Sequence, residues 1–336
     1  MAQQWLAEAK SMVRRAGLAG IARAGSAGLG LLAAALLLLS ACAGPQILAP
    51  GPGAPAAAIE TSDQAFIARD GYRLRWSVWQ AEGPVRGVIV ALHGMNDYGE
   101  TFRPAAEHWR GQGFTTYAYD QRGFGRTLGD GVWPGTDALT RDVTDAVRLV
   151  QARHPGVPVY LVGESMGGAV ALAALGSEEP PSVAATVLIA PGLQGWSRLG
   201  WLERAGLWTL AHLTPAEPLS GRGLDLKPSD NVDRLKAMAA DPFILKRVRA
   251  DALYGLVMLM EAANQRLATV QGPVLFIHGD QDDIAPMAAA RDAHSALGSR
   301  SDFAVIEGGF HLLLHGKEQD LVFNRVAAFF ARYSQR

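Results

Sequence analysis

A series of short apolar runs, separated by helix-like segments, constrains the fold more than any other feature of this sequence. The runs are VRGVIVALHG, GFTTYAYD, VPVYLVGES, AATVLIAPG, GPVLFIHGD and SDFAVIEGG. Their apolarity is continuous rather than alternating, which is typical of parallel strands buried on both faces. Apolar residues recur at helical spacing between them. The alternation predicts an α/β fold with a mostly parallel, doubly wound sheet and with sites at the carboxyl ends of its strands.

Two further segments refine this prediction. Two alternating stretches flank Asp70-Gly71 and predict an antiparallel hairpin at the start of the folded domain, which we place at residues 64–336. From about Leu193 to Asn264 there is no strand pattern but several helical ones. We therefore expect a helical cap, at about residues 193–264, inserted between two strands of the sheet.

The N-terminal residues have the layout of a secretory signal, with basic residues followed by AGLGLLAAALLLLSACAG. This apolar core is short for a membrane span, which needs about 20 residues, although an uncleaved anchor is the alternative interpretation. The only cysteine, Cys42, follows Leu-Ser-Ala, and this pattern resembles the lipobox of bacterial lipoproteins. The sequence predicts a signal peptide over 1–41, a lipid on Cys42, and an extended Pro/Ala/Gly-rich tether over 42–63 that holds the domain off the membrane.

Composition narrows the classes of partner and cofactor. With 31 basic and 32 acidic residues the chain carries a net charge of −1, which argues against nucleic acid as a partner. The chain contains no H-E-x-x-H pattern and no phosphate-binding glycine loop, so we predict no metal and no cofactor. The lipobox indicates an exported lipoprotein anchored in the cell envelope, on the periplasmic face, with the outer membrane as one possibility. The oligomeric state is left open.

The stretch LVGESMGGAV, residues 161–170, places a serine between glycines where a predicted strand meets a predicted helix. This is the setting of a nucleophile elbow, a tight turn that lifts the Ser165 hydroxyl clear of the sheet. Gly163 and Gly167 would let neighbouring backbones pass closely. A serine hydroxyl is a poor nucleophile at neutral pH, so a neutral histidine is needed to take its proton.

His311 is the predicted base, because it stands in VIEGGFHLLLHG, just past the last predicted strand. His315 lies one helical turn later and is expected to be a neighbour only. His93 and His278 each end a strand before a glycine, where an imidazole more often braces a turn. A carboxylate must fix the tautomer of the base.

The loop HGDQDDIAP offers three carboxylates, Asp280, Asp282 and Asp283, and spacing alone does not choose among them. The order of Ser165, an aspartate and then His311 along the chain is nonetheless that of α/β-hydrolase triads.

The chain from about Gly71 to Phe330 resembles α/β-hydrolases of the monoacylglycerol lipase and lysophospholipase group. The similar stretches are ALHGMNDYGETFRPAAEHWRGQGFTTYAYDQRGFGRT, LVGESMGGAVAL, HGDQDDIAP and GGFHLLLH. The resemblance implies the α/β-hydrolase fold and selects Asp282 as the triad acid, with Asp283 in reserve. It also implies that the backbone N–H groups of Met95 and Met166 form an oxyanion hole.

The resemblance and the apolar cap together favour a lipid substrate. Cap tryptophans Trp196, Trp201 and Trp208 are expected to bind an acyl chain or, as the alternative, only to pack the cap. We predict a serine hydrolase that cleaves carboxylic esters of lipids, monoacylglycerol or lysophospholipid, through an acyl-enzyme on Ser165. Two alternatives stay open: a hydrolase or acyltransferase acting on a non-lipid ester, thioester or peptide, and a non-catalytic binding lipoprotein.

Overall fold

The computed structural model describes residues 44–53, 56–60, 62, 64–127, 129–220 and 226–334. The predicted signal peptide and Cys42 lie outside these residues. Within the described part of the chain, no helix has the length and apolarity that a membrane crossing requires.

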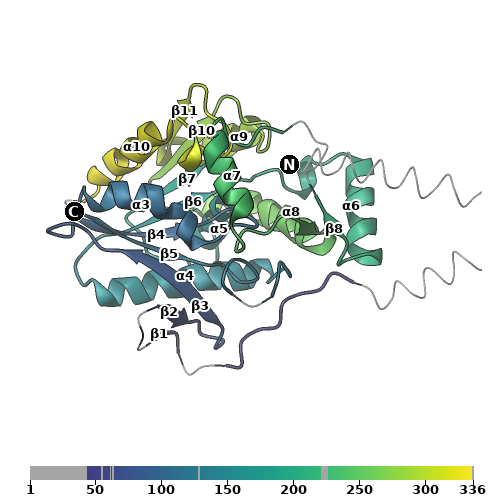
Figure 1. The fold of residues 1–336 in the computed structure, drawn as a ribbon, viewed down its shortest axis with the longest axis horizontal. Helices are drawn as coiled ribbons and strands as arrows, with labels where there is room; N and C mark the ends of the chain where they lie inside the picture. Colours follow the sequence, from purple (N-terminus) through teal and green to yellow (C-terminus); the bar gives the residue numbers. More distant parts are fainter. Residues whose placement is uncertain are drawn as a thin grey trace, which may run out of the picture.

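One large sheet organises the described residues (Figure 1). Its strand order is β1-β2-β3-β5-β4-β6-β7-β10-β11. The parallel part consists of β4 (Gly87–Leu92), β5 (Phe114–Tyr119), β6 (Val159–Glu164), β7 (Ala185–Ile189), β10 (Val274–Gly279) and β11 (Ser301–Ile306). The antiparallel part consists of β1 (Ala58–Ile59), β2 (Ala65–Ile67) and β3 (Arg73–Trp79). The predicted mostly parallel sheet with an N-terminal antiparallel hairpin is confirmed.

Helices cover both faces of the sheet. One face carries α3 (Arg103–Arg110) and α10 (Gln319–Ala331), and the other carries α4 (Thr136–Arg153), α5 (Met166–Leu175), α8 (Ala250–Gln265) and α9 (Met287–Leu297). In β4, Val88 and Val90 join the core beneath α4 and α5, whereas Ile89 and Ala91 join the core beneath α3 and α10. Burial on both faces is the physical reason for continuous apolar runs in the sequence.

The segment between β7 and β10 contains η2 (Trp196–Arg198), α6 (Trp201–Leu213), α7 (Val232–Ala240) and α8. It also contains a short antiparallel ladder of β8 (Pro218–Leu219) with β9 (Val248–Arg249), which no sequence pattern indicated. Two residues per strand are too few to produce a periodicity. Helix α8 packs on α5 and adds apolar side chains to the main core, whereas α6 lies farther out (Figure 1).

The structure differs from the predicted free tether over residues 44–53. The Leu48 N–H donates to Trp133 O at 2.8 Å, and its side chain packs against the main core. The Gln46 N–H donates to Asp251 Oδ2 at 3.1 Å. Residues 44–53 therefore lie along the domain. The composition of this segment did not indicate these contacts, because the residues that it contacts lie far away in the sequence.

Candidate active site

Ser165 lies at a sharp turn between β6 and α5. Its φ of 52° and ψ of −114° put it outside the usual regions for a residue with a side chain. A Cβ at Gly163 would lie 2.4 Å from Gly167 O, and one at Gly167 would lie 2.0 Å from Leu92 O. Neither position therefore accommodates any side chain. The glycines on each side of Ser165 allow three backbone segments to approach closely at the turn.

Three loops, each following a different strand, bring Ser165, His311 and Asp282 together. His311 Nε2 lies 3.0 Å from Ser165 Oγ, and His311 Nδ1 lies 2.9 Å from Asp282 Oδ2. The His311 side chain is 4% exposed. Since an aspartate oxygen accepts, Nδ1 carries the proton, which leaves Nε2 free to accept the serine proton.

The Asp282 carboxylate is fully enclosed and held by the backbone. Its side chain is 0% exposed, and its Oδ1 accepts hydrogen bonds from the N–H groups of Ile284 at 2.8 Å and Ala285 at 2.9 Å. Burial alone would raise its pKa, but the charge and hydrogen bond of His311, with the Ala285 N–H, keep the pKa of Asp282 below its usual range. Asp282 is therefore ionised at neutral pH beside the imidazole.

The neighbouring carboxylates lie elsewhere. Asp280 and Asp283 are both exposed, and Asp280 Oδ1 accepts from the Gly308 N–H at 2.8 Å. His278 donates from Nε2 to Ala285 O at 3.0 Å and so braces the acid loop. Of the three aspartates that spacing left open, the structure brings only Asp282 to His311.

Two segments that lie next to Ser165 carry the residues predicted to form the oxyanion hole. A Cβ built on Gly94, in the loop after β4, would lie 3.4 Å from Ser165 Cβ, so Met95 begins beside the nucleophile. Among the backbone hydrogen bonds between described loop residues, none uses the Met95 N–H. Met166 is the first residue of α5, where N–H groups have no acceptor within the helix. Met95 and Met166, the residues of the two predicted donors, therefore lie in segments next to Ser165.

His93 fixes the loop that carries Met95. Its Nε2 accepts the Gln121 N–H at 2.8 Å, its backbone oxygen accepts Gln121 Nε2 at 2.8 Å, and its Nδ1 donates to Gly94 O at 2.7 Å. Burial lowers the pKa of His93 to about 4, so the ring stays neutral and can accept. The expectation that His93 braces a turn is confirmed.

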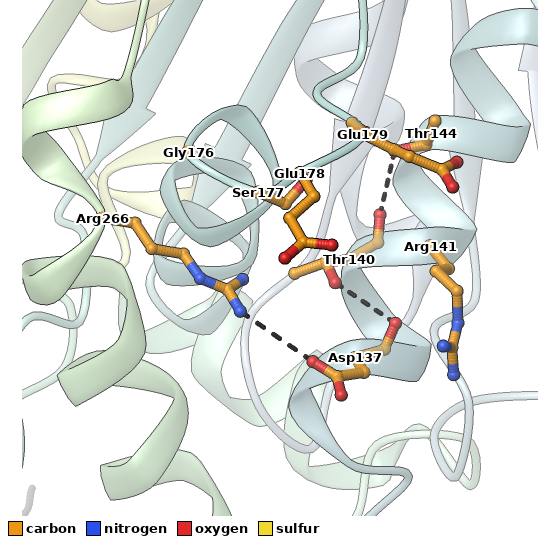
Figure 2. A pocket seen from close by; sticks show the side chains of 9 residues that line it. All are labelled: Asp137, Thr140, Arg141, Thr144, Gly176, Ser177, Glu178, Glu179 and Arg266. Carbon is orange, nitrogen blue, oxygen red and sulfur yellow. Dashed lines mark hydrogen bonds and ion pairs between the residues drawn. The ribbon is translucent and has the colours of Figure 1, made fainter.

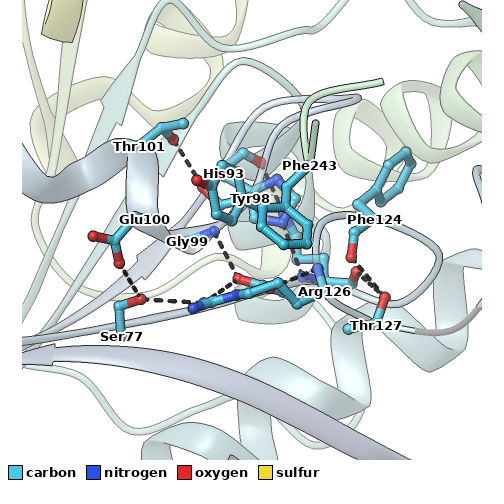
Figure 3. A network of polar contacts seen from close by, with 12 residues as sticks. Ser77, His93, Tyr98, Gly99, Glu100, Thr101, Phe124, Arg126, Thr127 and Phe243 are labelled. Atoms are coloured by element: carbon cyan, nitrogen blue, oxygen red, sulfur yellow. Dashed lines mark hydrogen bonds and ion pairs between the residues drawn. The ribbon is translucent and has the colours of Figure 1, made fainter. Parts of the chain in front are cut away.

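The loop after β5 supports the same region through Asp120, whose hydrogen-bond partners Gly99 and Arg126 are labelled in Figure 3. This buried carboxylate accepts from the N–H groups of Gly99 and Arg126, both at 2.9 Å, and from Arg126 Nε at 2.7 Å. No pattern in the sequence had predicted a role for these residues. The turn DQRGFGR was the signal available, because its aspartate follows a strand and its arginine stands six residues later.

The family model Hydrolase_4, described as "Serine aminopeptidase, S33", matches residues 83–319. This chain belongs to that family. The predictions of an α/β-hydrolase fold and of an ester hydrolase are confirmed.

Individual relatives agree with this assignment. A monoacylglycerol lipase of Mycolicibacterium smegmatis is 28% identical over 271 residues, covering 80% of this chain and 96% of that protein. Phospholipase YtpA of Bacillus subtilis is 26% identical over 260 residues, covering 76% of this chain and 98% of that protein. The crystal structure of Paleococcus ferrophilus monoacylglycerol lipase superposes with a TM-score of 0.66 at 22% identity, covering 77% of this chain and 99% of that one. The last similarity shows the shared fold.

This Hydrolase_4 protein has a buried polar cluster that includes Glu164, the residue immediately before the nucleophile. Ligand-type atoms of Asp97, Glu164 and His315 lie within 4.8 Å of one another. Burial raises the pKa of Asp97 to about 7 and that of Glu164 to about 8, and it lowers the pKa of His315 to about 3. Arg234 Nε donates to His315 Nδ1 at 3.2 Å, so the other ring nitrogen carries the proton and offers no lone pair. The cluster therefore does not fit a metal ion.

The cap tryptophans occupy different environments. Trp196 is half-buried and packs edge-on against Tyr254, with ring centroids 5.7 Å apart. Trp201 is 76% exposed and Trp208 is 49% exposed, both on α6. The structure therefore does not enclose Trp201 or Trp208 in a substrate pocket.

A polar cleft of about 460 Å³ is lined by Gly176 and Ser177 (Figure 2), which follow the C-terminal end of α5, whereas Ser165 precedes the N-terminal end of this helix. Its lining includes Asp137, Arg141 and Arg266, with Arg266 and Asp137 3.9 Å apart. Ten helical residues rise about 15 Å. The cleft is therefore separate from the candidate active site.

Proposed function

We propose that this hydrolase cleaves carboxylic esters of lipids, with a monoacylglycerol or a lysophospholipid as substrate, through an acyl-enzyme on Ser165. The observation that carries the proposal is the hydrogen-bonded series of Ser165, His311 and Asp282, beside the N–H groups of Met95 and Met166. These are the parts that acyl transfer requires.

The reaction proceeds in two halves. Ser165 Oγ attacks the carbonyl carbon while its proton passes to His311 Nε2, and the oxyanion accepts hydrogen bonds from Met95 and Met166. His311 then returns the proton to the departing alcohol oxygen, which leaves an acyl ester on Ser165. Water enters and attacks the acyl carbon while it loses a proton to His311. The bond between the acyl carbon and Ser165 Oγ then breaks, His311 returns the proton to Oγ, and the fatty acid leaves. Each oxyanion donor contributes about 3 kcal/mol to transition-state stabilisation.

Three observations support a lipid acyl group. Two of the relatives are named as a monoacylglycerol lipase and a phospholipase, and the alignments cover nearly their whole lengths. The Gly192 N–H donates to Ser165 O at 3.0 Å, and Met260 Sδ lies 3.5 Å from the Cβ position of Gly192. Buried Leu193 and Leu256 belong to the same apolar cluster as Met260. Apolar residues from the cap segment therefore reach the neighbourhood of the nucleophile.

The envelope location is part of the proposal. Cys42 is the only cysteine and follows Leu-Ser-Ala after an apolar stretch, which supports a lipid anchor on the cell-envelope side. Replacing Cys42 with serine is expected to release the protein into the soluble fraction. A Cys42→Ser protein that still sediments with membranes would contradict the anchor.

Ser165→Ala tests the nucleophile. We expect loss of labelling by a fluorophosphonate probe and loss of ester hydrolysis, with an unchanged circular dichroism spectrum. The exposed Ser295 supplies a matched control, since Ser295→Ala should keep both activities. Undiminished labelling of Ser165→Ala would remove this residue from its role.

A substrate panel tests the acyl class. Monoacylglycerols and lysophosphatidylcholines of increasing chain length are compared with p-nitrophenyl acetate and an aminoacyl p-nitroanilide. We expect kcat/KM to rise with chain length. A preference for the acetyl ester would contradict the lipid substrate, and a preference for the anilide would favour the peptidase named in the family description.

A further inference from the structure

Helix α6 carries large apolar side chains on its outward side as well as on its buried side. Its buried side carries Leu207 and Ala211, as expected. Its outward side, however, carries Trp201, Leu202 and Trp208, which are 76%, 52% and 49% exposed. A helix that faced only water would carry charged and polar residues there. Exposed tryptophan and leucine on one face mark an interaction surface.

Trp208, one of the two exposed tryptophans of α6, stacks on a neighbouring ring. The rings of Trp208 and His212 stack with centroids 4.2 Å apart, and His212 packs edge-on against Tyr254 of α8 at 5.5 Å. Tyr254 in turn contacts Trp196. This aromatic series ties the outer face to the cap interior, so Trp208 projects outward as part of a fixed surface.

The N-terminal part of the docked segment, residues 44–53, lies beside helix α6. Arg249 Nη2 donates to Gln46 Oε1 at 2.7 Å, and the Gln46 N–H donates to Asp251. The Asp251 N–H donates to Pro215 O at 3.0 Å, and Pro215 stands two residues after the end of α6 at Leu213. In Figure 1 the purple segment that starts at residue 44 accordingly begins on the α6 side of the molecule.

This position limits where a lipid anchor can lie. Cys42 is four residues before Gln46, and four extended residues span at most about 14 Å. A lipid on Cys42 would therefore enter the bilayer close to α6. The opposite side of the molecule, where α10 lies in Figure 1, would face away from the membrane.

We propose that the outward face of α6, formed by Trp201, Leu202 and Trp208, lies in the interface of a lipid bilayer, oriented by the docked segment 44–53. Tryptophan is enriched at such interfaces because its ring combines an apolar body with a polar N–H. The inference rests on the lipid anchor proposed for Cys42. It assigns to Trp201 and Trp208 contact with the membrane that supplies the substrate.

Fluorescence quenching tests the orientation. The full-length lipoprotein is reconstituted in vesicles of phosphatidylethanolamine and phosphatidylglycerol with brominated acyl chains, which quench tryptophans that reach them. Trp76, Trp79, Trp109 and Trp133 are buried in the domain, so Trp201 and Trp208 should carry most of the quenching. We expect quenching to fall by more than half in a Trp201→Phe/Trp208→Phe double variant.

Two further variants separate docking from anchoring. Leu202→Asp places a charge on the face and should abolish quenching while the protein still floats with the vesicles and still hydrolyses a soluble butyrate ester within about twofold. A tryptophan added on α10 by Leu321→Trp, at a position 43% exposed, should stay unquenched.

The outcomes are distinguishable. Unchanged quenching in Leu202→Asp or in the double variant overturns the proposal, as does equal quenching of the tryptophan added on α10. A dimer in detergent that Leu202→Asp dissociates, with quenching retained, would instead assign the face to a second copy of the chain and overturn the proposal. Failure of the native protein to float with the vesicles would refute the Cys42 anchor. Failure of the native protein to hydrolyse the butyrate ester, while it still floats, would refute the proposed reaction.

Discussion

Glu164, next to the nucleophile, offers a quantitative test of the buried cluster. Its side chain is 1% exposed, and its Oε1 has no hydrogen-bond partner among the described residues. Burial, followed by the nearby charge of Asp97, raises the pKa of Glu164 from an ordinary 4.5 to about 8. In the unfolded chain the same carboxyl ionises near its ordinary value. Folding therefore requires Glu164 to hold its proton across this interval.

The sign of the effect follows from proton linkage. Between pH 4.5 and 8 the folded state keeps a proton on Glu164 that the unfolded chain has released. The free energy of unfolding therefore falls as pH rises, by about 1.4 kcal/mol per pH unit. From pH 6.5 to pH 8 the loss from this carboxyl is about 2 kcal/mol.

The pKa values of other buried groups are the reason for choosing the interval from pH 6.5 to pH 8. His93 and His315 have pKa values lowered to about 4 and about 3, from an ordinary 6.5. They are neutral in the folded state and charged when unfolded, so they reduce stability only below about pH 6.5. Asp97, with a pKa of about 7, contributes in the same direction as Glu164 but is present in the native and the variant protein alike.

Urea unfolding at pH 6.5 and at pH 8 measures the difference. Glu164→Gln preserves the size of the side chain and removes its titration, so its free energy of unfolding should fall about 2 kcal/mol less over this interval than that of the native protein. Glu307→Gln, at an exposed position, is the matched control and should behave as the native protein. An equal fall in the native protein and Glu164→Gln would refute the neutral buried carboxyl.

Three further substitutions probe the site and its support. Asp282→Asn should lower kcat by about 10⁴ with the fold intact by circular dichroism, because the amide stabilises the wrong imidazole tautomer; a loss below tenfold would contradict the acid role. Gly167→Ala would put a Cβ 2.0 Å from Leu92 O, so we expect loss of probe labelling or of folding, and full activity would contradict the close approach. Arg122→Met strands buried Asp142, bonded at 2.7 Å, and should cost about 3–5 kcal/mol in urea unfolding; a loss under 1 kcal/mol would contradict this pairing.

Local patterns were sufficient wherever one short stretch carries the whole signal. The continuous apolar runs predicted β4, β6 and β10, because a strand buried on both faces has no polar side to show. The elbow was predicted from Gly163, Ser165 and Gly167 because a turn this tight limits residue type at neighbouring positions. Asp70-Gly71 predicted the hairpin for the same reason.

Contacts between distant segments needed the tertiary structure. Asp97, Glu164 and His315 form one buried cluster although they come from the loop after β4, the end of β6 and η5 (Leu313–His315), and no spacing along the chain indicates it. The docking of Gln46 onto Asp251 joins residues 205 positions apart. Composition alone had suggested an extended tether there.

Thus the sequence by itself determined the alternation of strands and helices, the serine elbow and the histidine loop, because periodicity and turn geometry are local properties of a chain. Spacing along the chain left three aspartates open beside His311, and the tertiary structure brings Asp282, the one that the family resemblance selected, to the imidazole. Only the tertiary structure decided that Trp201 and Trp208 face outward and that residues 44–53 lie along the domain. Those outcomes depend on which surfaces pack together. Packing is a property of the whole folded chain and has no counterpart in any single stretch of it.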